Sequence, residues 1–478
     1  MKYIFYIVSL CFVLFLFTGC APQTSMTVTT TPGNCPGGQV SAPYCMAVQM
    51  QNNSGGQNWI SSTNYPFTNV SVSVSGVNNI LSPSTNASMD PNGCTKNSTV
   101  PGGSCTFYLQ INQEQYPVGN VTPVTITINY AVNNELSAVF GGDGGTTNSY
   151  TFTIHEYTNL YAAQQNGRIL VYNKNGTTTY NIESIATTKI QSVATDNSAF
   201  GYVWIATNQG MYWFGIESSS GNTTYNPPGS TNAGISNIFT SQPSPFESAA
   251  TSPTTMYGVS GSIYPFTFSS MSWGTTALAT SPTGVLNNVN AVSFSGSYMV
   301  LTNGSIVYAC PTSGTSGTCN QEATPLTKIT SLGFVSTISQ TGYTGLYVGT
   351  ESGLYAESGI SFPQPAGTTN QWANVTGGGL TESAIINVIT TDDAGNAYAG
   401  DNSGNIWHIS GGSNTATLLA KVSSSPITAL IFDNIGNILF ATSDTTLYQC
   451  PLSGSCSAVA NIGNATMVDL AIGSTLSN

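Results

Sequence analysis

Charged side chains are scarce in this sequence, and positive ones are the scarcest. Only 5% of the 478 residues are charged, against about 25% in an average protein. Lys and Arg total 7 and Asp and Glu total 19, which gives a formal net charge of −12. A chain with so few cations cannot build a basic surface for nucleic acid phosphates or anionic lipid headgroups. The composition therefore excludes nucleic acid as a partner.

Sequence motifs for catalysis and metal binding are also absent. The chain has no GxSxG, HExxH, phosphate-binding or dinucleotide-binding motif. Its only histidines are His155 and His408. Neither lies near a cysteine pair, and His408 has no acidic partner in the sequence. We therefore predict that the protein is not an enzyme, has no catalytic residue and uses neither a metal ion nor a cofactor.

Apolar residues and glycine are abundant in place of charge. Hydrophobic residues make up 40% of the chain, with 24 Tyr and 19 Phe. This is too apolar for a disordered chain, which needs low hydrophobicity and high net charge. The 50 glycines, together with many Ser, Thr and Asn, favour an all-β protein whose surface is polar but uncharged.

The N-terminal residues resemble a bacterial lipoprotein signal peptide. Lys2 precedes an uncharged apolar run over residues 3–17, which is too short for a membrane-spanning helix but suits a signal peptide. The Thr-Gly-Cys triplet ending at Cys20 resembles a lipobox. The resemblance implies removal of residues 1–19, lipidation of Cys20 and, because Ala21 follows, an outer-membrane location. The alternative is an ordinary secretory signal with an incidental cysteine.

The other cysteines lie in close pairs along the sequence. Eight remain when Cys11 of the signal peptide and Cys20 are set aside from the total of 10. An even number of neighbouring cysteines in an exported chain predicts disulfides. Zinc is disfavoured because no pair has CxxC spacing or a histidine partner. The predicted disulfides are Cys35–Cys45, Cys94–Cys105, Cys310–Cys319 and Cys450–Cys456.

The first third of the chain has two predicted parts. Residues 20–34 show no hydrophobic period and predict a flexible tether. Over residues 35–156 apolar and polar residues alternate, as in 69–75 and 123–129, which predicts a sandwich of two antiparallel sheets. Residues 93–111, with a Pro-Gly-Gly turn between two cysteines, resemble bacterial Ig-like surface modules. The resemblance implies a small Ig-like β-sandwich.

Residues 157–478 repeat one strand–turn–strand pattern. Successive repeats lie 43, 53, 42, 48, 51 and 41 residues apart, measured between Tyr161, Trp204, Tyr257, Met299, Tyr347, Tyr398 and Leu439. Units of about 40–50 residues with four strands are typical of β-propeller blades. The repeats therefore predict a seven-bladed β-propeller, with a solenoid or two stacked sandwiches as the alternative. We expect residues 467–472 to pair with the repeat that begins at Asn159 and to close the ring.

Parts of these repeats resemble known propeller families. The turns 392–396 and 433–437 resemble the Asp-x-x-Gly-Asn hairpins of sensor-type propellers, and residues 353–380 resemble BNR and sortilin-type blades. Neither resemblance implies one activity, because propellers host many functions. BNR blades suggest a sialidase, which binds its substrate's carboxylate with three arginines. Arg168 is the only arginine here, so the sequence excludes that activity.

Several acidic residues at strand ends have more than one interpretation. Asp392 and Asp393 could form a carboxylate dyad or a calcium corner, but recurrence of the element at Asp433 favours a role in capping turns. Asp401 stands where other repeats have Thr207, Thr350 and Thr442. Its side chain is expected to face either the ligand or, in the favoured interpretation, solvent.

The turns between the second and third strands of the repeats form the predicted binding surface. In a propeller they all face one end, and here they carry many amides. Amides can hydrogen-bond sugar hydroxyls or peptide backbone without charge, although asparagine is also a common turn residue. The predicted ligand-binding residues are Asn166, Asn208, Asn303, Glu351, Asp401 and Asn402.

Together these features predict a lipid-anchored outer-membrane protein that binds a protein or glycan partner at the cell envelope. Its expected role is that of a non-catalytic scaffold, or of a subunit in an envelope or secretion assembly. One alternative is a carbohydrate-active enzyme with Asp401 or a turn carboxylate as its acid. Another is an adhesin displayed outward from the cell.

Overall fold

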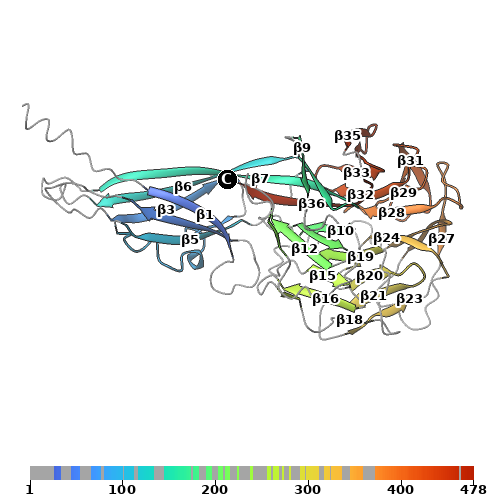
Figure 1. The fold of residues 1–478 in the computed structure, drawn as a ribbon, viewed down its shortest axis with the longest axis horizontal. Coiled ribbons are helices and arrows are strands. Elements are labelled where there is room, and N and C mark those ends of the chain that lie inside the picture. Colours follow the sequence, from blue (N-terminus) through green and yellow to red (C-terminus); the bar gives the residue numbers. More distant parts are fainter. Residues whose placement is uncertain are drawn as a thin grey trace, which may run out of the picture. The chain divides into compact units, whose positions relative to one another are not determined.

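A computed structural model gives the fold of the chain, which is all-β (Figure 1). The structure describes residues 26–33, 45–53, 66–76, 80–100, 102–111, 117–133, 145–173, 176–181, 190–195, 203–207, 210–215, 223–225, 237–240, 256–259, 262–267, 272–273, 279–280, 291–295, 298–311, 317–322, 325–335, 345–358, 372–461 and 465–477. In these ranges the one helix is the 3₁₀ turn η2 (Ala87–Met89). None of the described helical structure is long and apolar enough to cross a membrane.

The chain divides into two compact units. The first contains Met1–Glu114 and Thr122–His155, and the second contains Gln115–Val121 and Glu156–Ser477. The boundary falls within strand β7, so that β7 contributes residues to both units. The short segment Gln115–Val121 belongs to the second unit, although the residues before and after it belong to the first.

The first unit has two antiparallel sheets. One has the order β1-β2-β5-β4, and the other places β3 beside β6 and β6 beside β7. Each has one buried face, because alternate residues such as Val48 in β2 and Ile126 in β6 have no exposed surface. The strands are β1 (Met26–Gly33), β2 (Cys45–Asn52), β3 (Phe67–Ser75), β4 (Ile80–Leu81), β5 (Ser104–Ile111), β6 (Val121–Asn133) and β7 (Gly145–Gln164).

The predicted tether over residues 20–34 is wrong for its second half. Residues 26–33 form β1, which pairs antiparallel with β2 along its whole length. The run Met-Thr-Val-Thr-Thr-Thr lacks the bulky residues of a core strand, but Thr and Val favour extended backbone. Backbone pairing with β2 orders the segment without a strong hydrophobic pattern. Residues 20–25 lie outside the described part of the chain.

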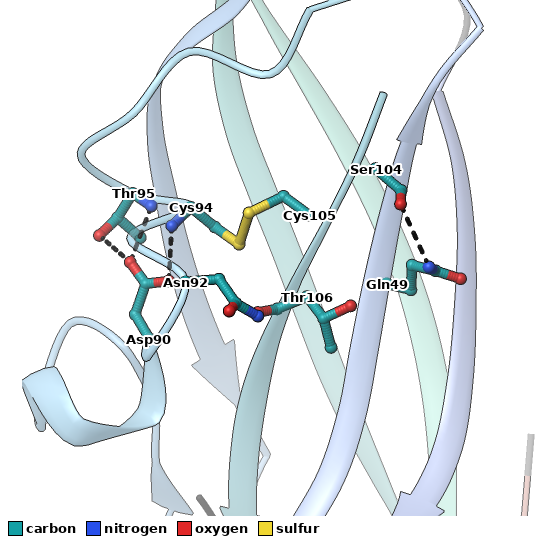
Figure 2. Close-up of a disulfide and its surroundings, with 8 residues drawn as sticks. All are labelled: Gln49, Asp90, Asn92, Cys94, Thr95, Ser104, Cys105 and Thr106. Atoms are coloured by element: carbon teal, nitrogen blue, oxygen red, sulfur yellow. Dashed lines mark hydrogen bonds between the residues drawn. A yellow bond between two sulfur atoms is a disulfide. The ribbon is translucent and has the colours of Figure 1, made fainter. Parts of the chain in front are cut away.

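A disulfide between Cys94 and Cys105 joins the loop before β5 to that strand. Next to it, the Asp90 carboxylate accepts hydrogen bonds from the backbone of Cys94 at 2.6 Å and from that of Thr95 at 2.8 Å (Figure 2). The Asn92 amide donates to the Thr106 carbonyl at 3.1 Å. Covalent and polar contacts thus fix the segment that resembles Ig-like modules.

The second unit contains several small antiparallel sheets, named here by their first strand. The β10 sheet has β10 (Ile190–Thr195), β11 (Val203–Thr207), β12 (Gly210–Gly215) and β13 (Thr223–Tyr225). The β14 sheet has β14 (Asn237–Thr240), β15 (Met256–Val259), β16 (Ser262–Thr267), β17 (Ser272–Trp273) and β18 (Ala279–Thr280). The β19 sheet has β19 (Ala291–Ser295), β20 (Tyr298–Thr302), β21 (Val307–Pro311) and β23 (Asn320–Glu322), and β22 (Gly317–Thr318) pairs with β18.

Three further sheets of four strands and a composite sheet follow. The β24 sheet has β24 (Ile329–Val335), β25 (Gly345–Thr350), β26 (Gly353–Ser358) and β27 (Ala373–Val375). The β28 sheet has β28 (Ile386–Thr391), β29 (Ala397–Asp401), β30 (Asn405–Ile409) and β31 (Ala416–Lys421). The β32 sheet has β32 (Ile427–Asp433), β33 (Ile438–Ser443), β34 (Thr446–Pro451) and β35 (Ser457–Asn461). The seam sheet, as we call it, joins the end of β7 to β8 (Arg168–Asn173), β9 (Gly176–Asn181) and the last strand, β36 (Met467–Ser477).

Neighbouring sheets share hydrophobic cores, so their strands are buried on both faces. In the seam sheet, Leu160 and Leu170 pack in one core with Phe440 of the β32 sheet. On the opposite side of the seam sheet, Tyr161 of β7 packs in a second core with Val203 of the β10 sheet. Similar cores join the β19 sheet to the β24 sheet, the β24 sheet to the β28 sheet and the β28 sheet to the β32 sheet. Burial on both faces explains the nearly continuous apolar runs of these strands.

The first strands carry a β-bulge at the same place in four sheets. The ladder shifts just after Ile190, Ile329, Ile386 and Ile427. The bulge turns a polar side chain toward the next sheet. Thr330 donates to the carbonyl of Ile386, and the Asn387 amide donates to the carbonyl of Ile427 at 3.3 Å. The same bond therefore joins the β24 sheet to the β28 sheet and the β28 sheet to the β32 sheet.

Two glycines let these isoleucines approach the preceding sheet. A Cβ atom on Gly349 would lie 2.7 Å from Cγ2 of Ile386, and one on Gly400 would lie 2.5 Å from Cγ2 of Ile427. Both distances are far below van der Waals contact. Glycine is thus required at these positions because of close approach and not because of backbone conformation.

The C-terminal strand β36 pairs with β7, as we expect from the sequence, and in Figure 1 it lies beside that strand. Its contacts match those of other first strands. Thr195 donates to the Ile472 carbonyl at 2.6 Å, and in the same register Thr391 donates to the Phe334 carbonyl at 3.2 Å. β36 therefore holds the first-strand position of the seam sheet.

Disulfides join the third and fourth strands of two sheets at equivalent positions. Cys310 in β21 bonds to Cys319, just before β23, and Cys450 in β34 bonds to Cys456, just before β35. With Cys94–Cys105, the structure contains three of the four expected disulfides. The fourth, Cys35–Cys45, is not tested, because Cys35 lies outside the described residues.

Candidate binding site

The turns between second and third strands lie at the same end of their sheets as the start of the first strand. In the β24 sheet the backbone N–H of Glu351 donates to the Lys328 carbonyl at 3.1 Å, just before β24. In the β28 sheet Asn402 donates in the same way to Ile385 at 2.9 Å. In the seam sheet Gln165 donates to Thr466 at 3.0 Å. The predicted binding turns thus have one fixed relation to the first strands.

Each of these turns is held by a buried polar side chain that ends the second strand. Thr302 Oγ1 accepts from the Gly304 N–H at 3.1 Å, and Thr350 Oγ1 accepts from the Ser352 N–H at 3.0 Å. Both threonines are almost fully buried. Their hydroxyl groups satisfy turn N–H groups that would otherwise lie unpaired beneath the surface.

Asp401 occupies this position in the β28 sheet, and its predicted place on the surface is wrong. The side chain is only 4% exposed. Oδ1 accepts from the N–H groups of Ser403 at 2.8 Å and Asn405 at 2.9 Å, and Oδ2 accepts from the Asn405 amide at 2.8 Å and Trp407 Nε1 at 3.0 Å. The loop from Asp401 to Asn405 is longer than the two-residue turn of the β24 sheet, and a carboxylate supplies the extra acceptor that it needs. Asp401 therefore faces neither solvent nor a ligand.

The register also corrects the predicted equivalents of Asp401. Asp401 pairs with Ile386, and Thr350 pairs with Ile329. In the β32 sheet the residue that pairs with Ile427 is Ser443, and Thr442 lies one position earlier. In the β10 sheet Thr207 pairs with Ile190, as the alignment predicts.

Asp392 has the same set of partners at the opposite end of the β28 sheet. Its carboxylate accepts from the Asn396 N–H at 2.7 Å, the Asn396 amide at 2.8 Å and the Tyr398 hydroxyl at 2.9 Å. Burial, and then the charge and hydrogen bond of Asp392, raise the pKa of Tyr398 well above its usual value. The spacing Asp-x₃-Asn-x-aromatic is common to Asp392 and Asp401. It therefore marks turn anchors and not a carboxylate dyad.

Two other side chains near Asp392 have shifted pKa values. Asp393 is exposed, and partial desolvation together with the charge of Asp392 raises its pKa. Burial lowers the pKa of His408, although the charge of Asp392 opposes this. His408 packs against Tyr398 with ring centroids 5.2 Å apart. It is a partly buried packing residue, as the sequence suggests.

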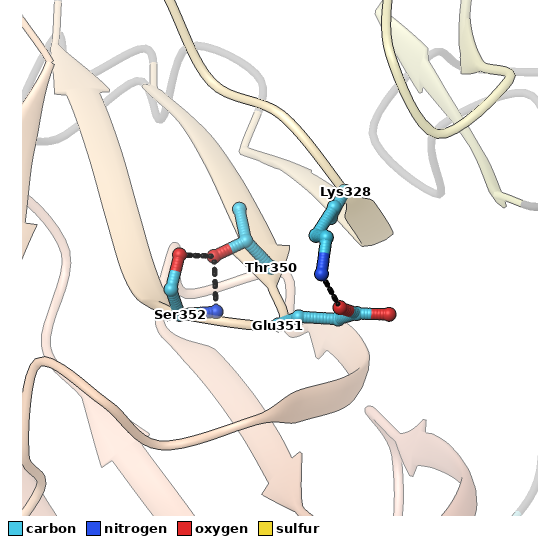
Figure 3. A network of polar contacts seen from close by, with 4 residues as sticks. All are labelled: Lys328, Thr350, Glu351 and Ser352. Atoms are coloured by element: carbon cyan, nitrogen blue, oxygen red, sulfur yellow. Dashed lines mark hydrogen bonds and ion pairs between the residues drawn. The ribbon is translucent and has the colours of Figure 1, made fainter.

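An ion pair lies at the turn end of the β24 sheet. Lys328 Nζ and Glu351 Oε2 are 2.6 Å apart, and the two side chains are 70% and 49% exposed (Figure 3). The hydrogen bond and the charge of Glu351 raise the pKa of Lys328. Lys328 has a left-handed backbone, φ 56, which is uncommon for a residue with a side chain. The predicted residue Glu351 thus lies on the surface, paired with a cation.

The other predicted binding residues differ in exposure and in hydrogen bonding. Asn166 and Asn402 are exposed. Asn303 is half-buried, and its Oδ1 caps the turn by accepting from Ser305 at 3.1 Å and Ile306 at 3.0 Å. Asn208 and the predicted lipidation site Cys20 lie outside the described residues.

Two polar residues of the seam sheet are not among the predicted binding residues. Gln164 is fully buried, and its amide donates to the Ala465 carbonyl at 2.9 Å, just before β36. Asp469 in β36 accepts from the Val193 N–H of β10 at 2.9 Å. Gln164 aligns with Asp401 and Thr350, so the repeat alignment contained a signal for it. Asp469 has no such signal, because the matching position in the β28 sheet is Val388.

The described residues contain no group of three or more His, Cys, Asp or Glu that could hold a metal ion. Asp392, Asp393 and Asp433 lie in neighbouring turns, where the Asp393 N–H donates to Asn434 at 2.9 Å, and turn donors occupy the carboxylates of Asp392 and Asp433. At the opposite end of the sheets, the turns between second and third strands offer a partner a polar surface with exposed amides.

Comparison with known proteins gives little further information. No family model matches the chain, and no curated protein matches it. Among solved structures it is similar to PorZ of Porphyromonas gingivalis, described as an essential bacterial surface component of the type-IX secretion system. The TM-score is 0.40 and the identity 13%, over 57% of this chain and 33% of PorZ. The chain thus spans about a third of PorZ, and a similarity this weak carries no argument about function.

Proposed function

We propose that the second unit is a closed seven-bladed β-propeller that binds a partner without catalysis at the cell envelope. Three contacts of β36 and its flanking residues have counterparts at other first strands and support closure. Thr195 donates to the Ile472 carbonyl, Gln165 N–H donates to the Thr466 carbonyl, and Met467 N–H donates to the Asp444 carbonyl at 3.0 Å. The last matches the bond from Ile329 N–H to Gly304 in the preceding sheet. On this proposal the seam sheet is one of seven blades.

The remaining contacts between sheets are consistent with a ring. β10 packs beside β14, and β18 of the β14 sheet pairs with β22, which lies within the β21–β23 connection. β24 packs beside β19 and β28, and β32 packs beside β28 and β36. Followed in this order, each sheet has a neighbour on both sides. A ring leaves no first strand with an open lateral face.

The observation that supports binding without catalysis is that the strand-end carboxylates are buried and hydrogen-bonded. Asp392, Asp401 and Asp433 are each less than 10% exposed, and each accepts hydrogen bonds from its own turn. A general acid or nucleophile must reach the substrate, and these carboxylates do not. The exposed amides of Asn166 and Asn402 in the turns are neutral and polar, which suits hydrogen bonding to a protein backbone or a glycan.

Crosslinking in intact cells tests this proposal. A photoreactive residue at Asn166 or Asn402 is expected to capture a defined partner, whereas the same residue at Ser453, in a turn at the opposite end of its sheet, is expected not to capture it. Equal capture from both ends, or from neither, would argue against a binding surface at the turns. Turnover of an oligosaccharide panel that is abolished by Asp401→Asn in a folded protein would favour the carbohydrate-active alternative.

The envelope location is a separate part of the proposal. We propose that Cys20 carries the lipid and that the protein is held at the outer membrane. Metabolic labelling with a palmitate analogue should mark the wild type and not Cys20→Ser, and the variant should leave the membrane fraction. Label that persists in the variant would contradict the lipid anchor. Protease treatment of whole cells would separate an outward-facing adhesin, which is cleaved, from a protein on the periplasmic side.

A further inference from the structure

The seam sheet lacks one connection that its neighbours have. In the β28 and β32 sheets the first and second strands are joined by the turns 392–396 and 433–437. In the seam sheet the first strand is β36 and the second is β7, and about 300 residues of sequence separate them. No turn of the same kind can therefore join them.

A short segment from elsewhere in the chain lies next to this point. Residues 117–120, which we call the strap, form a turn in which Asn120 N–H donates to the Pro117 carbonyl at 2.9 Å, with Gly119 at φ 86. Gly119 N–H donates to the Thr158 carbonyl at 2.9 Å, and Thr158 N–H donates to Asn120 at 3.1 Å. The strap thus pairs with β7 just before β7 enters the seam sheet.

The strap also reaches the β32 sheet. The Val118 N–H donates to Asp433 Oδ2 at 2.8 Å, and the Val118 side chain packs against the core shared by the β32 sheet and the seam sheet. That core includes Met467 and Leu470 of β36. One four-residue segment therefore touches both sheets on either side of the point where β36 docks.

The sequence of the Asp433 turn leaves an oxygen for this contact. Six residues after Asp392 and Asp401 stand Tyr398 and Trp407, and both donate to the second carboxylate oxygen. Six residues after Asp433 stands Leu439, which has no donor. The first oxygen of Asp433 accepts from its own turn, at 3.2 Å from Ile435 N–H and 3.0 Å from Gly436 N–H. Asp433 is 4% exposed, and within the described part of the chain Val118 of the strap is the one donor to its second oxygen.

We propose that the strap substitutes for the missing turn and acts as a latch on the seam. Release of Val118 from Asp433 leaves a buried carboxylate oxygen without a donor and uncovers the core beneath β36. Opening of β36 and release of the strap are then one event. The strap directly precedes β6 in the chain.

Hydrogen exchange on the full chain with Val118→Pro tests the latch. Proline removes the N–H group and is compatible with the turn, since it is favoured at the second position of a turn whose third residue is a glycine with positive φ. The amides of β36 should then exchange about tenfold or more faster, while those of β28 stay near wild type. Val118→Ala keeps the N–H group and is the matched control, with a smaller effect. Unchanged exchange in β36, or an equal rise in β28, would overturn the proposal.

A measurement on the wild-type protein needs no variant. If strap and seam open together, the amide of Val118 should be protected to the same degree as the amides of β36, within about a factor of three. Addition of mild denaturant should lower both protections with the same dependence on its concentration. A Val118 amide that exchanges freely while β36 remains protected would refute the latch.

Discussion

The β28 sheet and the seam sheet have the same contacts but different connectivity. The β28 sheet is formed by residues 386–421, all close in sequence, and its first two strands are joined by a turn anchored on Asp392. The seam sheet takes its first strand from residues 467–477 and its second from residues near 160. Yet Gln165 and Asn402 donate to the carbonyl just before the first strand in both. Local geometry is therefore set by packing against neighbouring sheets and not by chain continuity.

The difference appears in how the two sheets are secured. In the β28 sheet, Asp401 binds its own turn through both oxygens. In the seam sheet, Gln164 stands at the matching position and binds the residue before β36. A polar side chain that stabilises a turn in one sheet thus attaches a distant strand in the other. Non-covalent contacts replace the missing covalent link.

Removal of β36 should have the largest effect of all changes. A chain ending at Asn461 loses the buried side chains of Met467, Leu470 and Ala471, and it exposes the edge of β7 and the core shared with β10. We expect loss of cooperative unfolding in the second unit, measured by urea titration and limited proteolysis. A second copy of residues 465–477 supplied as a peptide should restore part of the protection. If the truncated chain unfolds like the full one, docking of β36 does not secure the seam sheet.

Asp401→Ala should be the most damaging single substitution in the β28 sheet. It removes an acceptor for Trp407 Nε1 and for turn N–H groups, at a cost of about 3–5 kcal/mol in the free energy of unfolding. Gln164→Ala removes one bond and should cost about 1–2 kcal/mol. Chemical denaturation measures both, with exposed Asn402→Ala as the control. Equal losses for Asp401 and Gln164 would mean that the two anchors do not differ.

Gly400→Ala should destabilise the contact between the β28 and β32 sheets. The new Cβ would lie 2.5 Å from Cγ2 of Ile427, and overpacking of this kind costs about 1–3 kcal/mol. The control is Gly454→Ala, where the nearest atom is 3.8 Å away, and its thermal midpoint should hardly move. Gly400→Ala should cost less when Ile427→Ala has already removed Cγ2, and such a double-mutant cycle would confirm the clash as the cause. A neutral Gly400→Ala would disprove close packing between these sheets.

The smallest expected effect is a dependence of the stability of the seam sheet on pH. Burial raises the pKa of Asp469 from 3.8 to about 7, although two backbone N–H groups act in the opposite direction. Because the folded pKa exceeds the unfolded one, its contribution to stability is greatest below about pH 4 and is lost as pH rises through 7. The exchange of β36 amides should therefore be faster at pH 8 than at pH 5 after correction for intrinsic rates, by a free energy of about 1–2 kcal/mol. Asp469→Asn should abolish this difference, and its persistence in the variant would exclude Asp469 as the cause.

Much of the fold could be predicted from residue patterns. Alternation in residues 123–129 identified β6, and the repeated strand pairs identified β25, β29 and β33. The spacing of Cys310–Cys319 and Cys450–Cys456 gave two disulfides. These features are local, because hairpins and their covalent links involve residues close in sequence. The strand β1 was missed because its order comes from pairing with β2 and not from its own pattern.

The candidate site was harder to predict because burial is not a local property. Asp401 and Asn402 are adjacent and polar, yet the first is buried and the second is exposed. A strand-end side chain that turns inward can be recognised only by its partners, here Asn405 and Trp407. The shared Asp-x₃-Asn-x-aromatic spacing was present in the sequence and would have shown that Asp401 resembles Asp392. The contact of Val118 with Asp433, 315 residues apart, has no sequence signal at all.

The pairing of β36 with β7 also has a consequence for biogenesis. A polypeptide emerges from the ribosome with its N-terminus first, so residues near 160 arrive long before residues 467–477. Until β36 has been synthesised, the backbone N–H and C=O groups of β7 that pair with it have no native partner and can bind strands of other proteins. The order of synthesis thus creates an interval of vulnerability, during which a molecular chaperone would protect the nascent protein from aggregation.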